Sequence, residues 1–335
     1  MSKQRKLSYL FSILWVAILF AAIMGAVATG VINSYYSGIL VLIGINIILA
    51  VSLNLVTGFL GQLVLGHAGF MSVGAYSAAL FTMHAGLPIS VAFPLGLIFG
   101  GLVAAIFGVI IGVPALRLRG DYLAIITLGF GEIIRVLVLA VDFTGGAAGL
   151  TGIPYIEGKY TLIIYTFFIA FLTVVAILAF IRSRHGRAVI AIREDEIAAE
   201  ASGINTTYYK LLAFVVAAFF AGVAGGIYAH YIGVLDPSKF DFNYSVEILI
   251  MVVLGGMGSI TGSVCSATVL TLLPEMLRSF ADKRMLIYSL VLIIVMLFKP
   301  TGLLGTREFS VRKIVGKLFK EKKKDTGTPP AGGAP

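Results

Sequence analysis

The residues of this chain that could do chemistry are few, and they stand inside long apolar runs. Glu132 and Arg135 are three positions apart, so on a helix they share one face and can partly neutralise each other. Charges at membrane depth are costly, so this pair either stabilises the fold or contacts a solute in a polar cavity. His67 stands alone among glycines. That setting favours a hydrogen-bonded packing role over gating or solute binding, and no nearby ligands accompany it for a metal.

Further polar residues are spaced for contacts between helices. Asn46 and Asn54 are eight positions apart, about two turns, so they lie on similar faces of one helix. They can bond to a neighbouring helix or, as a second possibility, line a path through a membrane together with Gln62. The sequence holds no Ser/His/Asp set, no metal-spaced cluster and no P-loop motif. We therefore predict no enzymatic activity, no metal and no cofactor, and any ATP must be bound by a partner.

Composition indicates which elements position these residues. Of 335 residues, 59% are hydrophobic and only 12% are charged, with a mean hydropathy of +1.01. Apolar runs of about 20 residues, the length that a helix needs to cross a bilayer, recur along the chain. We predict an all-α polytopic membrane protein with about ten transmembrane helices. The expected spans are 8–29, 36–57, 62–85, 88–113, 121–141, 160–181, 209–231, 245–257, 262–279 and 284–299.

Basic residues give these spans an orientation. With the N-terminus inside, the predicted outer segments carry only Lys159, Lys239, Arg278, Lys283 and Arg284. The positive-inside rule therefore predicts that both termini are cytoplasmic, and the net charge of +9 indicates orientation and not nucleic-acid binding. We expect a cytoplasmic N-terminus at 1–7, a membrane domain at 8–305, and a basic, partly disordered cytoplasmic tail at 306–335.

Glycines interrupt or line several of the expected spans. Interruptions are predicted at Gly66–Gly74, at Gly129 and Gly131, and at the GGMGSITG run of residues 255–262. Such breaks are tolerated in a membrane only where the backbone faces protein or a water-filled cavity. Small residues also recur every four positions, and we expect internal helix packing more than a subunit interface from them. These residues are Gly96, Gly100, Ala104, Gly108 and Gly112, with Gly222 and Gly226.

The densest cluster of charge is the polar loop at residues 182–208. Within it, Ile190, Ile197, Ala201 and Ile204 fall near one helical face, and acidic residues occupy the others. Gly203 and Asn205 are helix terminators. We predict a short helix parallel to the membrane that a cytosolic partner can bind. The alternative is an interfacial helix on lipid headgroups, which the acidic residues disfavour because anionic lipids repel them.

Five strings of this sequence together resemble one family. REDEIAAEASGIN (193–205) is similar to the coupling loop of ABC importer permeases. Four more resemble LivM-type permease subunits of branched-chain amino acid importers. They are NLVTGFLGQLVLGHAGFMSVGAYSAA (54–79), LRLRGDYLAIITLGFGEIIR (116–135), GGMGSITGSV (255–264) and FKPTGLLG (298–305). The resemblance covers residues from about 35 to 305, and permeases for urea and short amides share much of it.

The resemblance implies a transport function and a set of partners. The implied protein is a multi-pass permease of the bacterial inner membrane that moves Leu, Ile or Val by alternating access, with 182–208 as its coupling loop. Its partners are a second, LivH-type permease subunit, two cytosolic ABC ATPase subunits and an extracytoplasmic substrate-binding protein. An ion- or proton-coupled secondary transporter using Glu132 and Arg135 is the alternative, and a membrane enzyme comes third.

The resemblance and the polar residues together give two sets of site residues. The expected ATPase-coupling residues are Arg193, Glu194, Asp195, Glu196, Ala198, Ala199, Glu200 and Gly203. The residues expected along the translocation path are Asn54, Gln62, His67, Glu132 and Arg135.

Overall fold

The regular structure of the chain is helical. The computed structural model describes residues 34–118, 120–156, 160–278, 283–299, 302, 303 and 305. All of them lie within one unit, Asn33–Arg307. Apart from one β-bridge between Leu150 and Leu235, the elements of these residues are helices, which confirms the all-α prediction. The expected first span at 8–29, the N-terminal segment 1–7 and the tail at 306–335 lie outside the described residues.

Within the described part of the chain, five helices are long and apolar enough to cross a membrane. The first is α2 (Ser34–Asn54), which continues into the π-helical turn η1 (Leu55–Phe59). The others are α4 (Ile89–Ala115), α5 (Asp121–Ala140), α6 (Thr161–Arg182) and α9 (Thr206–Ile232). Shorter helices occupy the remaining expected spans: α3 (His67–His84), α10 (Phe242–Gly255), α11 (Ile260–Met276) and α12 (Arg284–Phe298). The chain is therefore a polytopic membrane protein.

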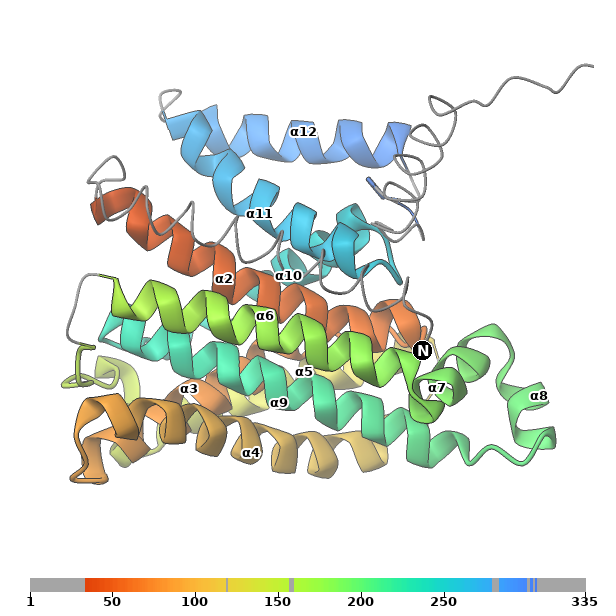
Figure 1. The fold of residues 1–335 in the computed structure, drawn as a ribbon, viewed down its shortest axis with the longest axis horizontal. Coiled ribbons are helices and arrows are strands. Elements are labelled where there is room, and N and C mark those ends of the chain that lie inside the picture. The colour runs from red at the N-terminus through yellow and green to blue at the C-terminus, as the bar shows by residue number, and fades with distance from the viewer. Residues whose placement is uncertain are drawn as a thin grey trace, which may run out of the picture. The chain divides into compact units, whose positions relative to one another are not determined.

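The closest packing joins α3, α4 and α9, and it depends on small residues. A Cβ added at Gly100 would lie 2.5 Å from the carbonyl oxygen of Gly74, and one at Gly108 would lie 2.9 Å from Cβ of Ala218. The backbones of Gly74 and Gly222 are closer still. Figure 1 shows α4 and α9 side by side along their length. The ladder of small residues thus packs inside the chain, as predicted, because only short side chains allow helix backbones to approach this closely.

Of the predicted interruptions, the one at residues 255–262 is a real break, whereas the one expected at Gly66–Gly74 lies earlier in the chain. Residues 60–66 are not helical, with Gly61 at φ +77°, so α3 begins at His67, not near residue 62 as expected, and runs unbroken through Gly69 and Gly74. Between α10 and α11, Gly256 and Gly258 take φ values of +110° and +84°. Both backbone conformations are ones that residues with a side chain rarely adopt. Each break therefore depends on glycine.

The third predicted interruption is wrong. Helix α5 runs unbroken through Gly129 and Gly131, because a glycine within a helix costs only about 1 kcal/mol. Gly131 instead provides space for a neighbouring chain segment. A Cβ added at Gly69 would lie 2.9 Å from the Cα of Gly131. The start of α3 therefore packs directly on the middle of α5.

The polar loop forms two short helices, not one helix over 193–205. Helix α7 (Arg184–Glu194) follows α6, and α8 (Glu196–Ala201) precedes α9, both at the same end of those helices (Figure 1). Asp195 separates them. Its backbone is extended, and its carboxylate accepts hydrogen bonds from the N–H groups of Ile197 and Ala198. An acidic side chain that caps a new helix stabilises this break.

Candidate functional site

Asn54 is the polar side chain that ties the end of α2 to the break between α10 and α11. It is fully buried. Its amide nitrogen donates to the carbonyl oxygen of Ser259 at 2.9 Å and to Oγ of Ser263 at 2.8 Å. Its amide oxygen accepts from the N–H of Gly258 at 2.9 Å. The predicted bonding of Asn54 to a neighbouring helix is confirmed.

Two other polar residues of this region also bond between helices. Asn46 donates to Oγ1 of Thr271 on α11 at 2.8 Å, as predicted. His67, buried at the start of α3, lies 3.0 Å from Oγ of Ser52 through Nε2. The Ser52 hydroxyl also bonds to the carbonyl oxygen of Leu49. His67 is therefore hydrogen-bonded to α2, as the packing role that the sequence favoured requires.

The N-terminal ends of α3 and α10 meet beside the middle of α5. The N–H of Ala68 donates to Oγ of Ser245 at 3.2 Å, and the N–H of Leu65 donates to Oγ1 of Thr127 at 3.1 Å. A cavity of about 10 Å³, roughly the space of one water, lies at this junction. Its lining includes Gly69, Gly131, Glu132, Phe240 and Ser245. Two helices thus begin inside the bundle, next to a carboxylate.

Two acidic residues line this cavity, Glu132 from α5 and Asp241 from the start of α10. Nε of Arg135 lies 2.7 Å from Oε2 of Glu132, so the predicted i,i+3 ion pair is confirmed. Both side chains are about one-third exposed. Neither Arg135 nor Gln62 lines the cavity, and Gln62 lies half-buried in the non-helical stretch before α3. Of the expected path residues, Glu132 lines this cavity and His67 begins α3 beside it, whereas Asn54, Gln62 and Arg135 do not line it.

Arg193 reaches from the end of α7 to the end of the first spanning helix. Its Nη1 donates to the carbonyl oxygen of Gly58 in η1 at 2.9 Å, and its Nη2 lies 3.2 Å from Oε1 of Glu194. The aliphatic part of the side chain crosses Gly61, where an added Cβ would lie 2.8 Å from Cγ of Arg193. Arg193 is therefore held by its own chain.

The acidic residues of the loop also have partners within the chain. Glu196 forms an ion pair of 2.7 Å with Nζ of Lys210, whose side chain is only 4% exposed. Thr206 donates to Oε1 of Glu200 at 2.6 Å. Glu196 is therefore half-buried against α9, whereas Glu200 bonds to Thr206 and stays exposed. A buried lysine needs a neutralising carboxylate, and this requirement draws Glu196 toward α9.

The outward face of α8 is apolar and small. Ile197 is 72% exposed, and Ala198 and Ala201 are exposed beside it. Ala199 is only 5% exposed, so it faces the loop and is not part of this surface, contrary to expectation. Ala199 lies on the opposite side of the helix from the exposed Ile197. The surface that α8 offers to a partner therefore centres on Ile197.

Gly203 ends α8, as predicted. Its φ is +82°, its N–H donates to the carbonyl of Glu200 at 2.9 Å, and the N–H of Ile204 donates to the carbonyl of Ala199 at 3.0 Å. These two bonds form a Schellman motif, which requires a left-handed residue at this position. Asn205 begins the next helix and does not end this one. Its side chain accepts from the N–H of Tyr208 at the start of α9.

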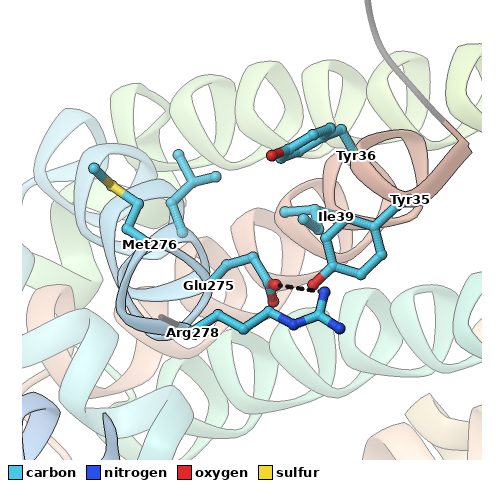
Figure 2. A pocket seen from close by; sticks show the side chains of 7 residues that line it. Tyr35, Tyr36, Ile39, Glu275, Met276 and Arg278 are labelled. Atoms are coloured by element: carbon cyan, nitrogen blue, oxygen red, sulfur yellow. Dashed lines mark ion pairs between the residues drawn. The ribbon is translucent and has the colours of Figure 1, made fainter. Parts of the chain in front are cut away.

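A larger cavity, of about 500 Å³, lies between the start of α2 and the end of α11. Figure 2 shows Glu275 and Arg278 facing each other there, with 3.7 Å between the paired atoms, and Tyr35 close to Arg278. The guanidinium carbon lies 4.9 Å from the centre of the Tyr35 ring. Arginine and tyrosine together are typical of the end of a membrane helix at the lipid headgroups. None of the sequence-predicted site residues lines this cavity.

Some residues of the site were missed by sequence reasoning. Lys210 had a signal, because a lysine at the start of an apolar helix requires a counter-charge nearby. Ser245 and Thr127 had none, since their partners lie 177 and 62 positions away along the chain. Gly58 contributes only its carbonyl oxygen, which no side-chain pattern reveals.

Spanning helices, two breaks inside the bundle and a structured loop between α6 and α9 define a helical membrane protein of the permease class. The family model described as "Branched-chain amino acid transport system / permease component" matches residues 35–299. The chain therefore belongs to that family of ABC transport permeases, and it is a transport protein and not an enzyme.

Individual relatives agree with the family match. The high-affinity branched-chain amino acid transport system permease protein LivM of Salmonella typhimurium (strain LT2) is 39% identical over 291 residues, 78% of this chain and 68% of the relative. The corresponding permease protein LivH of Escherichia coli (strain K12) is 35% identical over 143 residues, 42% of this chain and 46% of LivH. The permease protein BraD of Pseudomonas aeruginosa is 32% identical over 175 residues, 51% and 55% of the two chains. No solved structure shows a significant match.

Proposed function

We propose that this chain is the LivM-type subunit of an ATP-driven importer in the bacterial inner membrane, and that it moves Leu, Ile and Val inward by alternating access. It has about ten transmembrane helices with both termini in the cytosol. It pairs with a LivH-type permease, two cytosolic ABC ATPase subunits and an extracytoplasmic binding protein. The similarity to LivM over 78% of the chain supports the first part of this proposal.

The observation that carries the coupling role is the exposed apolar face of α8. This helix stands on the loop between two long apolar helices, and it presents Ile197, Ala198 and Ala201. A short helix with small apolar residues fits a groove on a partner protein. Lipid headgroups are a poorer match, because Glu194, Asp195 and Glu200 are exposed around this face.

The translocation path is proposed to pass the junction where α3 and α10 begin. The N-terminus of α3 carries partial positive charge and favours a carboxylate, whereas Glu132 and Asp241, which caps α10, favour an ammonium group. A zwitterionic amino acid has both. The buried hydroxyl of Ser72, one turn beyond Gly69 on α3, has no hydrogen-bond partner among the described residues, which adds a free polar group to this helix. We include His67, Asn54, Gln62 and Arg135 in the proposal as residues that support the path and do not line the cavity itself.

The secondary-transporter alternative is weaker on physical grounds. A proton-coupled carboxylate needs to change its protonation state during transport. The carboxylate of Glu132 is already engaged by Arg135 of the same helix at 2.7 Å. ATP hydrolysis by partner subunits is therefore the energy source that we propose.

The experiment is the substitution Ile197→Asp in the complete complex. A buried apolar contact at the centre of an interface contributes about 2 kcal/mol, so ATPase co-purification and leucine uptake should each fall by about tenfold or more. Insertion into the membrane should be unchanged, since Ile197 is exposed and its loop lies outside the spans.

The matched control is Val234→Asp, the same kind of change at an exposed residue on the other side of the membrane by the predicted topology. It should retain ATPase binding. If Ile197→Asp retains both ATPase binding and uptake, α8 is not the coupling element. If uptake by the wild-type protein persists in ATP-free vesicles with an ion gradient, the secondary transporter is the correct function.

A further inference from the structure

We propose that Arg193 acts as a transmission residue, which passes movement of the cytoplasmic loop to the break between α10 and α11, and does not itself dock on the ATPase. The proposal rests on the proposed function, because it assumes that an ATPase moves α8. It assigns Arg193 a role different from that of Ile197. Ile197 contacts the ATPase, and Arg193 passes the displacement of the loop to the membrane helices.

The first step of the argument is the direction of the Arg193 side chain. Its guanidinium donates to the carbonyl of Gly58 at 2.9 Å, and a Cβ added at Gly258 would lie 3.0 Å from Nη1. The guanidinium therefore sits between the end of α2 and the break that follows α10. Glycines at 61 and 258 leave room for the Arg193 side chain, since a Cβ at Gly61 would lie 2.8 Å from its Cγ.

The second step is that the contact of Arg193 with Gly258 leads on to hydrogen bonds at the break between α10 and α11. The N–H of Gly258 donates to Oδ1 of Asn54 at 2.9 Å, and Nδ2 of Asn54 donates to Ser259 and Ser263. A path of hydrogen bonds and direct contacts thus runs from α7 through Arg193 and Asn54 to the first turn of α11. Each residue along this path is held in place by its contact with the next residue.

The third step is that Gly58 is a sensitive point of attachment. It lies in a π-helical turn, a geometry that is often found at functional sites in helices. Carbonyl groups at a helix end lack partners within the helix, and a cation there is favoured by the helix dipole. Arg193 supplies both the hydrogen bond and the charge, so a shift of α7 has to move Gly58 or break this bond.

The fourth step is that both helices of the loop contact α9, and α7 also bonds to η1. Helix α8 is held to α9 by the Glu196–Lys210 ion pair and by the bond from Thr206 to Glu200. Helix α7 lies against α9 where the ring centres of His185 and Tyr209 are 5.9 Å apart, and Arg193 adds its bond to η1. Since Asp195 joins the two helices directly, a displacement of α8 also moves α7 and, through Arg193, η1.

The test compares Arg193→Met and Arg193→Lys with the matched control Arg187→Met in the complete importer reconstituted in vesicles. Arg187 is an exposed residue of α7, whose side chain reaches only the carbonyl of Arg182, at 3.4 Å. Arg193→Met should retain the ATPase subunits, but leucine uptake per ATP hydrolysed should fall by about tenfold, the loss expected for one charge-assisted hydrogen bond. Arg193→Lys keeps a cationic donor, so it should restore part of the leucine uptake per ATP hydrolysed. Arg187→Met should match the wild type.

A purely structural role for Arg193 predicts a different result. The amount of folded protein or its melting temperature would then fall, but uptake per ATP in the purified complex would equal that of the wild type. That outcome overturns the proposal, and so does loss of the ATPase subunits from Arg193→Met alone. If the wild-type complex itself retains no ATPase, the proposed importer function fails, which is a separate and distinguishable result.

The variant Arg193→Lys tests the proposal if Arg193→Met does not fold. Lysine keeps a positive charge and a donor beside the carbonyl oxygen of Gly58 but lacks the planar guanidinium. Uptake per ATP should then lie below that of the wild type, whereas the Arg187→Met control should match it. A lysine variant with a lowered melting temperature but wild-type uptake per ATP would contradict the transmission role.

Discussion

At the scale of single residues, the buried polar side chains differ in how many of their atoms are bonded. Asn54 uses both its amide nitrogen and its oxygen, in three bonds to the break between α10 and α11. Asn46, two turns earlier on the same helix, makes one bond to Thr271. In a membrane, one hydrogen bond between helices contributes about 0.6 kcal/mol, and an unsatisfied buried group costs more than that.

The substitutions Asn54→Leu and Asn46→Leu should therefore differ clearly. Asn54→Leu leaves the N–H of Gly258 without its partner and should destabilise the purified chain by about 2 kcal/mol, whereas Asn46→Leu should cost about 0.6 kcal/mol. The measurement is the melting temperature of each variant in detergent at equal protein concentration. Equal decreases for the two variants would show that Asn54 does not hold this junction.

The sequence predicted that these asparagines bond between helices, but it could not name their partners. Asn54 and Ser263 are 209 positions apart, and no local pattern connects residues at that distance. The same limit applies to Glu196. Its charge suggested an outward position, and only the three-dimensional structure reveals the buried Lys210 that attracts it.

At the scale of elements, the glycines of α3 and α9 set the distance between helices. The backbones of Gly74 and Gly222 are so close that a methyl group at Gly74 has no space. At Gly129 on α5 the same methyl group would meet no atom within 4 Å, and the backbone there is an ordinary helix. The two positions form a matched pair.

Gly74→Ala and Gly129→Ala should therefore have opposite effects on stability. Overpacking at Gly74 should destabilise the chain by about 1–3 kcal/mol, whereas alanine at Gly129 should be neutral or stabilising by up to about 1 kcal/mol, because it favours the helix. Thermal unfolding in detergent measures both. A Gly74→Ala protein as stable as the wild type would mean that α3 and α9 are not in tight contact.

Most helices could be predicted from the sequence because apolar runs of spanning length are a strong signal. The start of α3 and the split between α7 and α8 could not. Gly61 sets the start of α3 through a left-handed turn, and Asp195 separates α7 from α8 by capping α8. The sequence does not reveal these roles, because glycine and aspartate also occur within or beside unbroken helices. Gly129 and Gly131 are such a case, since the sequence predicts a break where the helix continues.

At the scale of the whole molecule, the loop between α6 and α9 and the end of η1 belong to one side of the membrane. Arg193 of the loop bonds to Gly58, and Glu196 bonds to Lys210 at the base of α9. The predicted topology puts this side in the cytosol because the basic residues concentrate there. The connection from α9 to α10, which holds Ser238, then lies on the outside.

Cysteine labelling tests this arrangement. The background should carry Cys265→Ser, so that the introduced cysteine is the only one in the sequence. Ser202 on the loop is exposed, and it is a better probe than Ser183, whose side chain caps α7. In intact cells a membrane-impermeant maleimide should label Ser238→Cys and should label neither Ser202→Cys nor Ser310→Cys. All three should react after lysis, since positive charge retained in the cytosol fixes the orientation of the chain. Labelling of Ser202→Cys in intact cells would invert the proposed topology and would place α8 where no cytosolic ATPase can reach it.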